Sequence, residues 1–346
     1  MARMNDLPPT HMFSEAACAA KVVCDQHRQN RAVIESVAQR LREDRPEIVL
    51  TCARGSSDHA ATFARYLIET RVGVLTSSQS LSIASVYARP QRIGRSLCIG
   101  ISQSGQSPDV LAAVKAARAA QAYCLALVNS EDSPLARTAD VVLPLCAGEE
   151  LSVAATKSYI AALAATIHLV SAWIRDAELT AALEAAPELL ARAWDEDWSQ
   201  LTESLRHTRG LYVVGRGLGL GIAQEAALKF KETCGIHAEA FSAAEIKHGP
   251  MALAGPDFPI LMFRQFDETA GSIDELVTEV VNRGSKVFIV GAKVPGAIDL
   301  PSLPAHPAIA PMLQIQSFYR AANALSLARG FDPDRPPHLR KVTKTV

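Results

Sequence analysis

An acid and an amine that could move a proton lie close together in the stretch 211–253. Glu225, Lys229 and Glu232 are spaced four and three residues apart, so on a helix they share one face. The helix would follow a short apolar strand and a turn rich in glycine, which lets the backbone approach a ligand. Such a row of charges is often only a solvated set of ion pairs, but at the end of a buried strand it can also act as an acid–base pair.

A second segment could hold a phosphate group. Three serines fall within 102–107, SQSGQS, between a buried strand and a helix that should begin near Pro108. The free N–H groups at a helix N-terminus and the helix dipole both favour an anion. Helix capping by Ser107 would explain one serine but not three, so the segment predicts a phosphate site. The group Gly-Ser-Ser at 55–57 follows the first strand in the same way and would contact sugar or phosphate.

Two isolated residues are further candidates. His248 lies in a turn before glycine and proline, where a histidine is usually incidental, although an imidazole can give and take a proton near neutral pH. Lys341 lies in a basic tail that is ordinarily solvated, but a lysine on a fixed extended tail could reach a carbonyl and form an imine. The sequence contains no spacing of His, Cys, Asp and Glu that is typical of a metal site.

The glycines at 215, 217, 219 and 221 do not form a dinucleotide-binding motif. A G-x-G-x-x-G pattern fails in every register, because the sixth position never holds glycine. We therefore expect no nicotinamide cofactor, and no other cofactor is indicated.

Strands alternating with helices are expected along most of the chain. Strands are predicted at 47–52, 96–101, 123–128 and 141–145. The pattern then recurs at an offset of 162 residues, which places 53–55 on 215–217, 97–101 on 259–263 and 125–128 on 287–290. The repeat predicts an α/β protein with two domains of one type, each a parallel sheet covered by helices on both faces.

The other segments divide the chain into five parts. The tail contains several prolines after Gly330 and should be extended rather than helical. We expect an N-terminal helical arm at 1–42, a first domain at 43–175, connecting helices at 176–205, a second domain at 206–330 and a C-terminal tail at 331–346 that reaches the active site.

Composition excludes several classes of protein. The 346 residues are 49% hydrophobic and carry a formal net charge of -1, which suits two globular domains and gives nucleic acid or an acidic membrane no general attraction. The first residues lack a hydrophobic signal region, and no run reaches a membrane-spanning length free of charge. The seven cysteines contain no C-x-x-C pair, so we expect reduced thiols in a cytoplasmic protein.

Together these motifs resemble the sugar isomerase (SIS) domain family, and within it the isomerase half of the glucosamine-6-phosphate synthases. The resemblance covers nearly the whole chain in the family's order and implies two tandem SIS domains that act on a hexose 6-phosphate, as a homodimer and without metal or nucleotide. It rests on the motifs at 55–57, 102–105, 153–157, 227–232, 236–240, 245–250 and 339–341.

The resemblance also implies a role for each candidate residue. Glu232 matches the base that moves a proton between C1 and C2 of the sugar, and Lys229 matches its assisting amine. His248 matches the ring-opening residue, which in this family can come from the neighbouring subunit, and Lys341 matches the tail lysine that meets the open-chain carbonyl. The substrate-binding residues implied by the motifs are Gly55, Ser56, Ser57, Ser102, Gln103, Ser104, Ser107, Val153 and Ala154.

Two departures from the synthases bear on the reaction. The chain starts Met-Ala-Arg and lacks their glutaminase domain, so we expect an enzyme of the reverse reaction: a deaminase that isomerises glucosamine 6-phosphate to a fructose imine, which water hydrolyses to fructose 6-phosphate and ammonia. Arg54 stands where the synthases usually have a smaller residue, which could alter the sugar or amine handled. The alternatives are a galactosamine-6-phosphate deaminase, a sugar-amine phosphate deglycase, a simple aldose–ketose isomerase, or a sugar-phosphate sensor without turnover.

Overall fold

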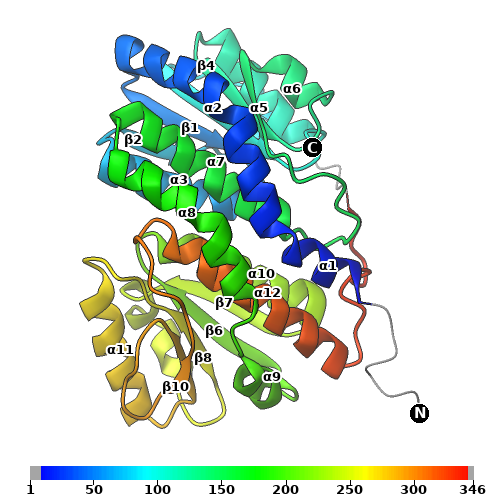
Figure 1. The fold of residues 1–346 in the computed structure, drawn as a ribbon, viewed down its shortest axis with the longest axis vertical. Coiled ribbons are helices and arrows are strands. Elements are labelled where there is room, and N and C mark those ends of the chain that lie inside the picture. The colour runs from blue at the N-terminus through cyan, green and yellow to red at the C-terminus, as the bar shows by residue number, and fades with distance from the viewer. Residues whose placement is uncertain (1–8, 342–346) are drawn as a thin grey trace.

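The computed structural model describes residues 9–341, in which two α/β domains lie one above the other in Figure 1. The beginning of the predicted N-terminal arm and the last five residues of the predicted tail lie outside the described residues. The limits predicted for the five parts of the chain stay predictions.

The first domain contains a five-stranded parallel sheet in the order β2-β1-β3-β4-β5. Every residue of its central strand β3 is buried, as expected for a sheet covered on both faces. The strands are β1 (Ile48–Cys52), β2 (Leu75–Ser78), β3 (Ser96–Ser102), β4 (Tyr123–Val128) and β5 (Val141–Pro144). The helices are α3 (Ser56–Arg71), α4 (Ser82–Ser85), α5 (Pro108–Ala119), α6 (Pro134–Thr138) and α7 (Lys157–Ile174).

The second domain contains another five-stranded parallel sheet, in the order β10-β9-β8-β6-β7. Its strands are β6 (Gly210–Gly215), β7 (His237–Ser242), β8 (Ile260–Phe263), β9 (Val287–Val290) and β10 (Ile298–Leu300). Its helices are α10 (Gly219–Cys234), α11 (Ala270–Asn282) and α12 (Ala310–Ala328), with short 3-10 turns at η2 (Glu245–Lys247) and η3 (Pro250–Leu253).

The predicted repeat is present in the order of the strands. In each sheet the first strand of the domain lies between the second and the third, and the fourth and fifth follow on the other side. Gly55 and Gly217, which the offset pairs, both adopt a positive φ, 55° and 57°, just before α3 and α10. The prediction of two α/β domains with parallel sheets and flanking helices is confirmed.

Four helices join and cover the domains: α1 (His11–Ala17), α2 (Ala19–Asp44), α8 (Ala177–Trp194) and α9 (Ser199–Leu205). Helix α2 packs along α7 and α8, and α1 packs against α12. Helix α7 is long and apolar enough to cross a membrane, but 89% of it is buried inside the protein. It is therefore the central core helix of the first domain.

The two domains meet where α3 packs against α10. A Cβ atom added at Gly221 would lie 2.7 Å from the His59 carbonyl oxygen and 3.1 Å from the Phe63 nitrogen. Further along the same contact, Ser56 reaches Lys229. Since residue numbers rise along one helix as they fall along the other, α3 and α10 are antiparallel, and glycine permits their close approach.

We expect Gly221→Ala to lower the free energy of unfolding by about 1–3 kcal/mol, because the added methyl group would meet backbone atoms that cannot move freely. Gly271→Ala in α11 is the matched control, since a Cβ atom there meets nothing within 4 Å. That change should be neutral or stabilise by up to about 1 kcal/mol. Denaturant unfolding of both variants measures the difference, and equal stabilities would contradict a tight crossing.

Candidate active site

A cleft of about 320 Å³ opens at the carboxyl ends of β1 and β3 in the first sheet. This is the edge at which parallel α/β sheets bind ligands. The loops after β1 and β3, the segment before α7, the end of α10 and the C-terminal tail all contribute to it. Its lining residues are Arg54, Gly55, Ser56, Ser57, Ser102, Gln103, Ser104, Ser107, Val153, Ala155, Lys229, Glu232, Leu339, Arg340 and Lys341.

The cleft brings together all of the predicted site residues except two. Ala154 is fully buried and does not line the cleft, whereas the adjacent Ala155 does. His248 is exposed at the end of η2 in the second domain and is likewise outside the lining. In a single chain, therefore, the histidine stands apart from the other candidates.

The loop after β3 is shaped by a serine and a glycine. Ser102 Oγ accepts a hydrogen bond from the backbone nitrogen of Gly105 at 3.0 Å. Gly105 has a φ of 62°, and a Cβ atom there would lie 2.1 Å from Ser133 Oγ, so only glycine fits. Ser107 is the N-cap residue of α5, yet its side chain makes no capping hydrogen bond. Its hydroxyl is thus available for an anion at the helix N-terminus.

Arg54 adds a positive charge beside this loop. Its Nε donates to Asp109 Oδ2 at 2.7 Å, and the half-exposed guanidinium lines the cleft. Asp109 is buried in the first turn of α5, where its carboxylate would repel a phosphate at the helix start. The guanidinium offsets that charge, so the residue noted in the sequence only as a departure belongs to the anion-binding end of the cleft.

Lys229 is buried among carboxylates at the other end of the cleft. Its Nζ donates to Glu232 Oε2 at 2.6 Å and to Ser56 Oγ at 3.1 Å, and it lies 3.2 Å from Glu225 Oε1. Burial lowers the pKa of Lys229, but the carboxylates of Glu225 and Glu232 outweigh burial and raise it above its ordinary value. Lys229 therefore remains an ammonium that orients Glu232 and does not itself act as a base.

Glu225, which was noted in the sequence only as a helix partner of Lys229, anchors this cluster. It accepts hydrogen bonds from Ser56 Oγ and the Tyr319 hydroxyl, both at 3.1 Å, and lies 3.0 Å from His59 Nδ1. Burial raises the pKa of Glu225, but Lys229 and His59 lower it further, so the net shift is downward and the carboxylate stays ionised. The four-residue spacing to Lys229 was its only sequence signal.

The tail brings Lys341 into the cleft, where a buried carboxylate receives it. Lys341 Nζ donates to Glu150 Oε2 at 2.9 Å and to the Ser152 carbonyl oxygen at 2.7 Å. Glu150 is in turn fixed by hydrogen bonds from Ser158, through its nitrogen at 3.2 Å and its Oγ at 2.8 Å. Sequence reasoning missed Glu150, because its partner lies 191 residues away and no local pattern marks it.

The tail is held by the N-terminus of the described chain. Asp334 accepts hydrogen bonds from the backbone nitrogens of His11 and Met12, both at 2.7 Å, at the beginning of α1. Its own carbonyl oxygen accepts from the Val153 nitrogen at 3.3 Å. The segment 331–341 contains no helix or strand, in agreement with the predicted extended tail.

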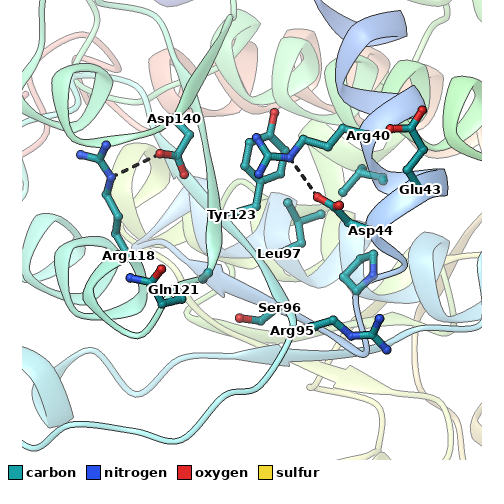
Figure 2. Close-up of a pocket in the computed structure, with 13 residues that line it drawn as sticks. Arg40, Glu43, Asp44, Arg95, Ser96, Leu97, Arg118, Gln121, Tyr123 and Asp140 are labelled. Atoms are coloured by element: carbon teal, nitrogen blue, oxygen red, sulfur yellow. Dashed lines mark hydrogen bonds and ion pairs between the residues drawn. The ribbon is translucent and has the colours of Figure 1, made fainter.

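A second cavity, of about 610 Å³, lies at the opposite, amino end of the same sheet (Figure 2). Its arginines are paired: Arg40 with Asp44 at 2.9 Å, and Arg118 with Asp140 at 3.3 Å. The Arg40 guanidinium also lies 3.9 Å from the centre of the Tyr123 ring. None of the predicted site residues lines this cavity, so its arginines provide a comparison for Arg54.

Comparison with known proteins decides the family. The family model for the SIS domain matches residues 41–172 and 204–302. The chain belongs to the SIS domain family. It is 35% identical to a glutamine–fructose-6-phosphate aminotransferase [isomerizing] of Aeropyrum pernix, over 86% of this chain and 51% of that protein. A namesake from Thermotoga maritima is 30% identical, over 90% and 56%. The SIS chain thus spans about half the length of these curated relatives.

Solved structures support the same resemblance. A Silicibacter pomeroyi protein, provisionally described as a phosphosugar isomerase, is 38% identical with a TM-score of 0.91, covering 94% of this chain and 100% of its own. The C-terminal domain of a glucosamine-fructose-6-phosphate aminotransferase from Francisella tularensis is 26% identical with a TM-score of 0.87, covering 97% and 100%. A Thermotoga maritima glucosamine-6-phosphate deaminase, 22% identical with a TM-score of 0.72 over 94% and 99%, shares the fold. The predicted resemblance to the synthase isomerase half is confirmed.

We expect Arg54→Gln to weaken the binding of inorganic phosphate about tenfold, since it removes a charged donor from the cleft. Arg40→Gln is the matched control, because Arg40 is also paired with a carboxylate but lies in the other cavity. Isothermal titration of phosphate into both variants tests the expectation. An unchanged phosphate affinity in the Arg54 variant would remove this residue from the anion-binding end.

Proposed function

We propose that this SIS-domain protein is a phosphosugar isomerase that deaminates glucosamine 6-phosphate, giving fructose 6-phosphate and ammonia. One observation carries the proposal: a single cleft holds the serine loops, the Lys229–Glu232 pair and the tail lysine, Lys341. A phosphorylated sugar spans such a cleft, with its phosphate at the helix N-terminus and its reacting carbons at the charged cluster.

The phosphate end would be bound by neutral donors together with one cation. The hydroxyls of Ser102, Ser104 and Ser107 line the cleft at the start of α5, and the Arg54 guanidinium lies beside them. This arrangement fixes the sugar without involving the groups that move protons. Binding energy from the phosphate can then position C1 and C2 for reaction.

The reacting end would transfer a proton between neighbouring carbons. Glu232 takes the C2 proton of the open-chain amino aldose and returns it to C1, through a planar enolamine. The products of this step are a C1 hydroxyl group and a C2 imine. Water then adds to the imine, and the C2–N bond breaks to release ammonia and leave the ketone.

The two lysines would serve different parts of this step. Lys229, held as an ammonium, keeps the Glu232 carboxylate ionised and turned toward the cleft through their 2.6 Å contact. Lys341 engages the open-chain carbonyl group, with Glu150 and the Ser152 carbonyl oxygen positioning its Nζ. The acid–base group and the carbonyl-binding group thus come from separate elements, α10 and the tail.

The direction of the reaction follows from the chemistry of the matched half. The curated relatives are named for glutamine as the amine donor, whereas this chain matches a C-terminal domain of such a protein. Proton transfer between C1 and C2 interconverts the amino aldose and the keto imine, and water alone completes the conversion to ketose and ammonia. The reaction available to this half without a second catalytic centre therefore begins with the amino sugar.

The first test is ammonia release from glucosamine 6-phosphate, without glutamine, compared with galactosamine 6-phosphate and N-acetylglucosamine 6-phosphate. We expect ammonia and fructose 6-phosphate in equal amounts, and a loss of about 10²–10⁴ in kcat for Glu232→Gln, which keeps the shape but not the base. Glu188→Gln, on the exposed side of α8, is the control. Wild-type turnover by the Glu232 variant would refute the assignment, and interconversion of sugar phosphates without ammonia would identify a simple isomerase.

We further propose that His248 acts in the cleft of a second copy of the chain, because it is exposed and outside the cleft of its own chain. Glu232→Gln and His248→Ala should each be nearly inactive. After subunit exchange, their mixture should recover about a quarter of wild-type activity, the statistical yield for two-fold dimers with one intact site in each mixed pair. A mixture that stays inactive would mean that His248 serves its own subunit or takes no part.

A further inference from the structure

The second domain contains a crevice at the position equivalent to the candidate active site. Its cavity volume is about 800 Å³. By the offset of 162 residues, Gly217 and Leu218 take the positions of Gly55 and Ser56, and the loop 266–269 takes that of 104–107. The segment 306–308 precedes α12 just as 153–155 precedes α7.

The antiparallel contact of α3 and α10 completes this correspondence. Helix α10 extends Lys229 and Glu232 into the first cleft, and α3 extends the equivalent positions, Leu67 and Thr70, into the second. Leu218 replaces the serine that binds Lys229 in the first cleft. The second crevice therefore has an apolar floor and no acid–base pair, so it is suited to binding without proton transfer.

The anion position of the second crevice is occupied by a carboxylate of the chain. Asp267 Oδ1 accepts hydrogen bonds from the Thr269 nitrogen at 2.9 Å and from its Oγ1 at 2.5 Å, at the start of α11. Glu268 adds a second, exposed carboxylate. Arg264, at the position of Ser102, is paired with Asp274 at 2.8 and 3.0 Å. A phosphate group would meet repulsion here.

The remaining lining groups have the chemistry of a carbohydrate site. Phe266, at the position of Ser104, is 43% exposed, and Tyr66 adds a second ring. His306 Nδ1 accepts a hydrogen bond from the Ala308 nitrogen at 3.1 Å, so in the neutral ring Nε2 carries the hydrogen. Burial lowers the pKa of His306, and nearby Arg71 lowers it further, which favours this neutral donor.

We propose that this crevice binds an unphosphorylated hexose. The C–H face of the sugar packs on Phe266, while the carboxylates of Asp267 and Glu268 accept hydrogen bonds from its hydroxyl groups or from an amino group, and His306 Nε2 donates one. The sequence repeat thus yields two sugar-binding crevices that differ in the group they require: the first needs a phosphate, and the second excludes it.

The experiment measures glucose and glucosamine binding by saturation-transfer NMR, with inorganic phosphate titrated separately by calorimetry. The matched variants are Phe266→Ala and its counterpart in the first cleft, Ser104→Ala. We expect Phe266→Ala to weaken sugar binding about tenfold and leave phosphate affinity unchanged. Ser104→Ala should do the reverse. Because Phe266 is exposed, its removal should leave the melting temperature nearly unchanged, which provides the folding control.

The arms give distinct outcomes. Tighter binding of glucosamine than glucose would support the carboxylates as ammonium partners, and equal binding would support hydroxyl recognition. Absence of saturable sugar binding to the wild-type protein would overturn the proposal. So would sugar binding that is lost with Ser104→Ala and kept with Phe266→Ala, since the sugar would then lie in the first cleft. The phosphate titration reports on the first cleft separately.

Discussion

A buried ammonium group holds the two domains and the candidate active site in one arrangement. Lys229 is 1% exposed, and its charge is tolerated only because Glu225, Glu232 and Ser56 surround it. Breaking one side of such a buried pair typically costs about 3–5 kcal/mol, because the remaining charge is left uncompensated. Since Ser56 belongs to the first domain and the other three belong to the second, the geometry of the cleft depends on this contact between α3 and α10.

Sequence periodicity and turn residues were sufficient to predict the architecture. The apolar runs that became β3, β4, β8 and β9 are bounded by glycine or polar turns, and their offset of 162 residues revealed the repeat. Strands β2, β7 and β10 were missed because they are short or polar: β2 reads LTSS and lies at the sheet edge. Such strands form because a neighbouring strand offers hydrogen bonds, and that partner is not visible locally.

The site was predictable where its residues are contiguous and obscure where they are not. The serine loops and the Lys229–Glu232 pair are local motifs, so their grouping in one cleft could be anticipated. Glu150 has no such signal, because its importance arises from a lysine brought in by the tail. The position of His248 outside the cleft was equally hidden, since it depends on how the second domain packs.

The hydrogen bonds of Asp334 to the start of α1 have a practical consequence for work on this protein. They tie both ends of the described chain to the wall of the cleft, so the tail lysine depends on the N-terminal helix for its placement. Affinity tags, fusions or proteolytic trimming at either end would therefore act on the catalytic machinery itself. Untagged protein is the appropriate reference for any kinetic measurement.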